Sequence, residues 1–148
     1  AASYTDAKTR NDLCTRQPCG GEENPVLAAK GTRLPITPRF KASGTARYSI
    51  PVGTAKAYIQ GLVAHQSSAS ADIRTFQAGT LGRLKAYTTA NALIGADLSG
   101  YTLELFVQNL WDERAQLSRF QQCGTCSQRT YIVSSTPRTI GLRAGAKF

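Results

Sequence analysis

The last ten residues of the chain read Thr139-Ile140-Gly141-Leu142-Arg143-Ala144-Gly145-Ala146-Lys147-Phe148. Every second residue from Ile140 to Phe148 is apolar, and the residues between them are Gly, Arg or Lys. Successive side chains of a β-strand point to opposite faces, so this pattern predicts a strand with one apolar and one polar face.

The same period of two recurs along the chain. It is clear from Phe40 to Ile50 and from Tyr101 to Gln108, and weaker in residues 55–66 and 86–98, whereas helical periodicity is nearly absent. The predicted fold class is therefore all-β, with six antiparallel strands near residues 1–9, 38–50, 55–66, 86–98, 101–111 and 138–148.

Short and long connections alternate between these strands. Tight turns are predicted at 51–54 and 97–100, and long loops at 10–37, 67–85 and 112–137. Outer-membrane barrels have this layout, with short periplasmic turns and long outer loops, and their strands of about nine to eleven residues cross the bilayer when tilted. Aromatic residues near the strand ends fit the girdles at the membrane interfaces. The pattern favours transmembrane β-strands over a soluble sandwich.

Composition excludes several other classes of protein. The 148 residues contain 41% hydrophobic residues, which is too many for a disordered tail. Apolar runs are too short for a transmembrane helix. The 18 Lys and Arg against 9 Asp and Glu give a net charge of +9, but the basic residues are scattered and no nucleic-acid motif accompanies them. We therefore expect no nucleic-acid partner.

The four cysteines form two close pairs, Cys14 with Cys19 and Cys123 with Cys126. Both pairs lie in stretches rich in Gly, Ser, Thr and Gln, which predicts local loop disulfides in an oxidising compartment. A shared zinc site is disfavoured because the first pair has the wrong spacing and the pairs lie far apart in the sequence. The second pair also has the spacing of a redox motif, but without the helix N-terminus that makes such a motif reactive. A surface metal site is the alternative if the cysteines are reduced.

The sequence contains no recognisable catalytic constellation. His65 is the single histidine, and no motif places a carboxylate to orient it beside a nucleophile. We therefore expect a protein that is not an enzyme, with no catalytic residues, no metal ligands and no cofactor.

Four passages resemble the C-terminal part of a TonB-dependent outer-membrane receptor. Residues 31–40 are similar to the family's Gly-x-x-Leu-Pro-x-x-Pro segment, and residues 103–114 to an apolar strand ending in Asn-Leu-Phe-Asp, with Trp in place of the usual Phe. A Pro-Arg pair opens the last strand, and the chain stops at an aromatic residue. The motif positions are Leu34, Pro35, Pro38, Asn109, Leu110, Trp111, Asp112, Pro137, Arg138 and Phe148.

This resemblance implies a larger protein. Such receptors have a barrel of about 22 strands closed by an N-terminal plug domain, so the chain would supply about six C-terminal strands. They lie in the outer membrane of Gram-negative bacteria and import siderophore-bound iron, vitamins or glycans with energy delivered by TonB. The plug and the TonB box are not among these residues, so contact with TonB would need the missing N-terminal part.

The resemblance also implies partners. These are outer-membrane lipids, lipopolysaccharide and the barrel-assembly machinery, which in the family recognises the terminal aromatic pattern. In this chain the pattern comprises Ile140, Leu142, Ala144, Ala146 and Phe148.

Basic residues outnumber acidic ones in the long loops, which favours an anionic ligand. The candidate contacts are Arg74, Arg119, Phe120 and Tyr131. Such cations could instead bind lipopolysaccharide phosphates or remain solvated, and the transported ligand does not follow from the sequence. The alternative hypothesis is a small secreted soluble β-rich binding module, stabilised by two local disulfides.

Overall fold

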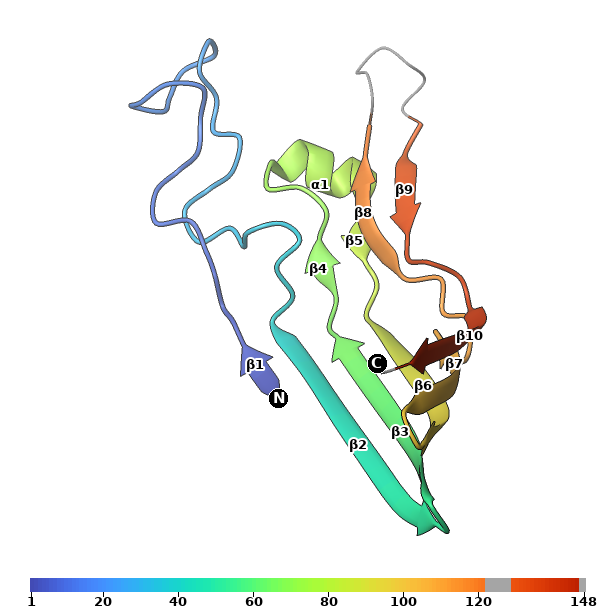
Figure 1. Ribbon diagram of the computed structural model, residues 1–148. Helices are drawn as coiled ribbons and strands as arrows, with labels where there is room; N and C mark the ends of the chain where they lie inside the picture. Colours follow the sequence, from blue (N-terminus) through green and yellow to red (C-terminus); the bar gives the residue numbers. More distant parts are fainter. Residues whose placement is uncertain (122–128, 147–148) are drawn as a thin grey trace.

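The computed structural model describes residues 1–121 and 129–146, and its fold is all-β with one short helix. Six antiparallel strands form the main sheet in the order β1-β2-β3-β6-β7-β10 (Figure 1). Their bounds are β1 Ala2–Tyr4, β2 Phe40–Val52, β3 Ala55–Gln66, β6 Tyr87–Leu98, β7 Tyr101–Gln108 and β10 Thr139–Ala146.

Two small antiparallel pairs extend this sheet at one end. The strands β4 (Ala69–Ser70) and β5 (Arg83–Leu84) pair with each other beyond β3 and β6, and β8 (Gln116–Phe120) pairs with β9 (Tyr131–Ser134) beyond β7 and β10. Helix α1 (Thr75–Leu81) connects β4 to β5. Figure 1 shows the long connections gathered at the end opposite the β2–β3 turn. They thus form one region in which distant parts of the sequence meet.

The long connections contain more regular structure than the sequence predicts. Residues 67–85 hold β4, α1 and β5, and residues 112–137 hold β8 and β9. The first strand is shorter than the predicted range 1–9, because the ladder with β2 ends at Tyr4. Beyond it, the chain pairs irregularly with residues 28–34, with isolated bridges Lys8–Arg33 and Leu13–Ala28.

The two hairpins have two-residue turns. Gly53 has a φ of 60°, which an L-residue with a Cβ adopts at a cost. In the second turn both Ser99 and Gly100 have positive φ, as in the turns that match the right-handed twist of a hairpin. Both turns therefore hold the register of the strands that they join.

The register separates the main sheet into two faces of opposite character. The apolar face contains the row Tyr48, Ile59, Ile94, Leu105 and Leu142, which are paired in this order across five strands. The polar face contains every charged residue of the described strands in this sheet, namely Lys41, Arg47, Lys56, Asp97, Glu104 and Arg143. Among the described residues, the apolar face carries no Asp, Glu, Lys or Arg.

The apolar face is exposed. The five side chains of that row are each about half exposed or more, with exposed fractions from 48% to 67%. The small buried cluster of Ala69, Ala71, Leu81 and Leu84 lies elsewhere, where β4, α1 and β5 meet. Contiguous exposed apolar surfaces commonly mark sites of contact with another protein or with a membrane.

Two aromatic rings on the polar face lie over glycines of the next strand. The ring of Tyr58 covers Gly95, where an added Cβ would come within 2.6 Å of Tyr58 Cζ, and Phe106 covers Gly141 in the same way. Tyr58 donates a hydrogen bond to Glu104 at 2.7 Å, and the guanidinium of Arg47 lies 3.8 Å from the centre of its ring. These contacts join β2, β3, β6 and β7 through side chains as well as backbone.

No helix in the described part of the chain is long and apolar enough to cross a membrane.

Candidate ligand-binding site in the long connections

Hydrogen bonds tie the three long connections together. Thr75 N donates to Leu27 O and Ile36 N to Ser70 O, both at 2.9 Å, so the first connection is held against α1 and β4. Arg119 Nη1 of β8 donates to Leu81 O of α1 at 2.7 Å, which holds the third connection to the second. Any cavity between them therefore has walls from separate parts of the sequence.

A cavity of about 300 Å³ lies between α1 and β8, and we call it the Arg119 cavity. Three of the four side chains predicted to contact a ligand line it: Arg74, Arg119 and Phe120. The fourth, Tyr131 of β9, stacks on Phe120 with ring centres 5.6 Å apart and planes at 17°. The structure thus places three of the four residues at one cavity and the fourth against Phe120, although they come from two different connections.

The two arginines of this cavity differ in charge compensation. Arg74 forms a bidentate pair with Asp72, through Nε at 3.1 Å and Nη2 at 2.9 Å. The hydrogen bonds from the Arg74 side chain lower the pKa of Asp72 below its ordinary value, and the carboxylate in turn raises the pKa of Arg74. Arg119 bonds only neutral oxygens among the described residues, those of Gln116 and Leu81. Its positive charge is therefore available to a ligand.

A guanidinium with no carboxylate partner among the described residues can bind an anionic ligand. Arg presents a planar fork of donors to carboxylate and phosphate groups, and an aromatic ring offers a flat apolar surface. A cavity of about 300 Å³ is at the lower end of the range for small-molecule sites, which suits a small ligand or one part of a larger ligand.

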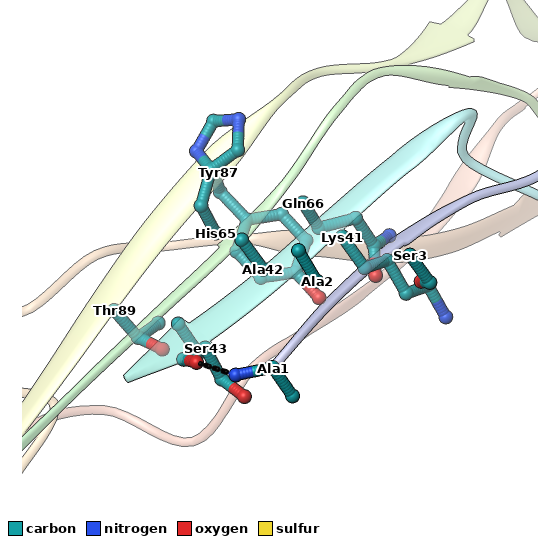
Figure 2. A pocket seen from close by; sticks show the side chains of 11 residues that line it. Ala1, Ala2, Ser3, Lys41, Ala42, Ser43, His65, Gln66, Tyr87 and Thr89 are labelled. Atoms are coloured by element: carbon teal, nitrogen blue, oxygen red, sulfur yellow. Dashed lines mark hydrogen bonds between the residues drawn. The ribbon is translucent and has the colours of Figure 1, made fainter. Parts of the chain in front are cut away.

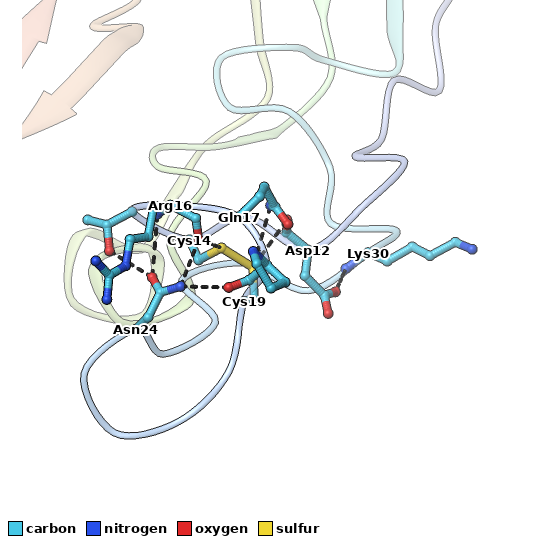
Figure 3. The surroundings of a disulfide bond; sticks show 9 residues. Asp12, Cys14, Arg16, Gln17, Cys19, Asn24 and Lys30 are labelled. Atoms are coloured by element: carbon cyan, nitrogen blue, oxygen red, sulfur yellow. Dashed lines mark hydrogen bonds between the residues drawn. A yellow bond between two sulfur atoms is a disulfide. The ribbon is translucent and has the colours of Figure 1, made fainter.

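The predicted disulfide between Cys14 and Cys19 is confirmed (Figure 3). It closes a short loop that the buried Asn24 also holds, because Asn24 Nδ2 donates to the carbonyls of Arg16 and Pro18 at 2.7 and 2.9 Å. This loop is therefore ordered by a covalent bond and by side-chain hydrogen bonds. Cys123 and Cys126 lie outside the described residues.

Asn109 of the predicted Asn-Leu-Trp-Asp motif ties the end of β7 to the start of β10. Its side chain is buried and donates to the carbonyls of Glu113 and Thr136 at 2.9 and 3.0 Å, while it accepts from Glu113 N at 2.9 Å. Its φ of 53° lies in the left-handed region, which Asn tolerates better than most residues. This position has a structural role in the fold.

The neighbouring motif residues also join strands. Leu110 N donates to Ala90 O at 2.7 Å, and Trp111 Nε1 donates to Thr88 O at 2.7 Å. Asp112 accepts from the backbone N of Arg138 at 2.9 Å and from Arg114 Nη2 at 3.0 Å. The Arg138 backbone bond is the main cause that lowers the pKa of Asp112.

The other predicted motif residues lie in the segments that lead into β2 and β10. Leu34 N donates to Ala7 O at 3.1 Å, Pro35 O accepts from Thr37 Oγ1 at 3.0 Å, and Pro38 is buried. Pro137 O accepts from Thr139 Oγ1 at 3.2 Å, next to β10. On β10, the terminal pattern residues Ile140, Leu142, Ala144 and Ala146 all lie on the apolar face, whereas Phe148 lies outside the described residues.

A further cavity, of about 390 Å³, lies where the short strand β1 meets β2 (Figure 2). Small side chains of Ala2, Ala42 and Ser43 form part of its lining, and Ala1 N donates to Ser43 O at 2.7 Å. The cavity forms because small side chains lie where the pairing between β1 and β2 ends. Lys41 is the one charged side chain among its lining residues, so it offers fewer binding groups than the Arg119 cavity.

His65 lies at the end of β3, where its Nδ1 is 2.8 Å from Thr88 Oγ1 and its ring is 6.2 Å from that of Phe40. Within residues 1–121 and 129–146, no group of three or more His, Cys, Asp or Glu side chains is arranged to hold a metal ion.

No protein-family model, curated protein sequence or solved structure matches the chain.

Proposed function

We propose that this chain forms part of the wall of an outer-membrane β-barrel and belongs to a TonB-dependent receptor that imports a scarce small ligand. The observation that carries the proposal is the segregation of charge in the main sheet. Six charged residues on five strands all lie on the polar face, and the exposed apolar face has none among the described residues. In a transmembrane barrel the apolar face contacts lipid and the polar face lines the lumen.

The size of the apolar face supports a membrane. It extends along β2 from Phe40 to Val52, a stretch of 13 residues. At about 3.3 Å per residue the stretch is about 40 Å long. A tilt of about 40° reduces its height to about 30 Å, which is the thickness of the hydrocarbon core of a bilayer.

The open edges of the sheet support a larger barrel. β1 covers only Phe40–Ala42 of β2, and β10 pairs only with β7. The backbone groups of β2 from Thr45 to Val52 have no strand beside them on that edge within the described residues. Unpaired backbone groups in lipid cost several kcal/mol each, so a membrane sheet of this kind needs further strands to close it.

The small buried core disfavours the soluble alternative. A secreted binding module would use the apolar face of its sheet as a core, but that face is exposed and the buried cluster is formed by the β4, α1 and β5 region. The Arg119 cavity lies among the long connections, where the ligands of a receptor would arrive. Residues 31–40 and 103–114 resemble motifs of TonB-dependent receptors, and this resemblance supports the receptor family among the outer-membrane barrels.

Fluorescence quenching by brominated lipids tests the lipid contact. Both variants are made in a Trp111→Phe background, so that each has one tryptophan among these residues. Ile94→Trp places it on the apolar face, and Leu93→Trp places it at the adjacent position, on the polar face. We expect lipids brominated in the acyl chain to quench position 94 strongly and position 93 weakly. Equal quenching at both positions in the complete protein, reconstituted in vesicles, would contradict the membrane proposal.

Uptake by the complete protein tests the receptor assignment. The coding sequence upstream of Ala1 is expected to encode a plug domain and further strands of alternating polarity. Ligand uptake by a strain expressing the complete gene should disappear when TonB is deleted. A barrel whose uptake does not change in that strain would retain the membrane assignment and exclude the receptor family.

A further inference from the structure

We infer that a second cavity, between residues 32–39 and the β4–β5 ladder, binds a small molecule bearing a phosphate or carboxylate group. We call it the Arg39 cavity; its volume is about 310 Å³. Three arginines line it: Arg33 and Arg39, which precede β2, and Arg83 of β5. The inference concerns binding alone, so it holds or fails independently of the transport function.

Two carboxylates lie near this cavity, and they balance only part of its positive charge. Asp72 also lines the cavity, but both its oxygens accept hydrogen bonds from the Arg74 side chain. Asp6 lies 2.8 Å from Lys8 Nζ, whereas its contacts to Arg39 and Arg33 are longer, at 3.5 and 3.8 Å. An excess of positive charge therefore remains around the cavity, and an anion would lower its electrostatic energy.

Arg39 has a buried donor without a partner. Its Nε is inaccessible to solvent and donates no hydrogen bond to any described residue. Buried polar atoms in folded proteins nearly always have a hydrogen-bond partner, so the Arg39 guanidinium is incompletely compensated in this structure. Charge-assisted hydrogen bonds from a guanidinium to a phosphate or carboxylate are among the stronger ones in proteins.

Hydroxyl groups complete the lining. Ser68 Oγ accepts from Arg83 Nη2 at 3.0 Å, which fixes the direction of that guanidinium and leaves the hydroxyl proton free to be donated. The hydroxyls of Thr32 and Thr75 also line the cavity, and neither donates a hydrogen bond to a described residue. The lining thus offers both charged and neutral donors to an oxyanion.

The walls of the cavity are held before any ligand binds. Ile36 N donates to Ser70 O at 2.9 Å, and Ser67 N donates to Phe40 O at 2.9 Å. Phe40 N in turn donates to Ser67 Oγ at 3.1 Å. Because three hydrogen bonds join the two segments that form the walls, less ordering is needed on binding, which favours affinity.

Isothermal titration of the complete protein in detergent tests the inference, with inorganic pyrophosphate and citrate as probes and sucrose as the neutral control. We expect at least one probe to bind with a millimolar or tighter Kd and sucrose not to bind. Arg39→Gln and Arg83→Gln should each weaken binding at least tenfold, and Arg39→Lys should weaken it less than Arg39→Gln. The matched control Arg10→Gln, in an exposed loop, should change it less than twofold, and Arg119→Gln identifies any binding of the probes in the other cavity.

The outcomes separate the possible sources of the anion. Displacement of pyrophosphate by citrate would indicate a soluble ligand, and displacement by micellar phosphatidic acid alone would indicate a lipid headgroup; both support an oxyanion site. No binding of either probe would overturn the inference. So would binding that Arg39→Gln and Arg83→Gln leave unchanged, or binding that is lost only in Arg119→Gln. The thermal unfolding midpoint of each variant shows whether it keeps the fold. Arg83 makes no ion pair with Asp6, whereas Arg39 does, so Arg83→Gln tests the inference even if Arg39→Gln unfolds.

Discussion

Replacing Ile59 with Arg places a charge in the middle of the apolar face of the central strand β3. Ile59 is 55% exposed and pairs with Tyr48 on one side and Ile94 on the other. It lies four residues from the start of β3 and seven from its end. At about 3.3 Å per residue and a tilt of about 40°, it is about 10 Å from one interface and about 18 Å from the other.

The expected decrease in the free energy of unfolding depends strongly on whether lipid or water contacts this face. In lipid, an Arg near the middle of the bilayer destabilises a barrel by about 2–4 kcal/mol, a factor of about 30 to 800 in the folding equilibrium. In water, the same substitution at an exposed position changes stability by about 0.5 kcal/mol or less. The two environments therefore predict results that differ by more than the error of an unfolding experiment.

Urea unfolding in lipid vesicles, followed by the fluorescence of the single residue Trp111, measures this free energy. Gln60→Arg is the matched control, because the adjacent side chain lies on the polar face of the same strand. Val52→Arg, beside the β2–β3 turn, should cost about 0–1 kcal/mol because it lies near the interface. The reasoning is refuted if Ile59→Arg costs no more than Gln60→Arg, or if the cost does not decrease from Ile59 to Val52.

Three other substitutions test contacts inside the protein. Gly95→Ala should lower the free energy of unfolding in urea by about 1–3 kcal/mol, because the added Cβ would displace the ring of Tyr58. Gly61→Ala is the control and should be nearly neutral, because no atom lies within 4 Å of its added Cβ. Equal effects of the two substitutions would contradict the ring contact. Asn109→Ala should lower the free energy of unfolding by about 3 kcal/mol in the same assay, since three side-chain hydrogen bonds are lost at about 1 kcal/mol each. A decrease of less than about 1 kcal/mol would exclude the role of Asn109 in linking β7 to β10. Asp72 has a lowered pKa in the folded protein, so its contribution to stability is present above its ordinary value of 3.8 and lost as pH falls through the lower folded value. The protection of the α1 amides against hydrogen exchange, relative to the intrinsic rate at each pH, should therefore fall in that acidic range. Asp72→Asn should remove this pH dependence, and a protection profile that the substitution leaves unchanged would refute the role of Asp72.

The strand pattern was the part of the fold that the sequence could predict. Alternation in residues 101–108 and 139–146 reflects a local rule, in which side chains point alternately to two faces, so it is visible without tertiary information. Phe106 broke that alternation in the sequence, and the structure explains it: the ring lies over Gly141 of the next strand, and Arg143 lies 5.5 Å from its centre. Such a contact depends on register between strands and has no signature within one strand.

Helix α1 and the arrangement of the connections could not be predicted in this way. The helix has seven residues, one of them Gly79, and its N-cap Arg74 makes no side-chain capping bond. A helix this short gains little from propensity and depends on packing, here of the buried Leu81. Arg33, Arg39 and Arg83 were visible as basic residues, but only the fold brings them to one cavity.

In the main sheet all charged side chains of the described strands lie on one face, and this placement also limits how the sequence can change in length. Deleting one residue from the middle of β3 would shift Tyr58 and Gln60 relative to their neighbours, and half of the strand would present its polar side chains to the apolar side. Deleting two residues would keep each side chain on its own face and only shorten the strand. We therefore expect insertions and deletions in these six strands to be tolerated better in even numbers than in odd numbers, whereas in the connections no rule of even and odd numbers applies.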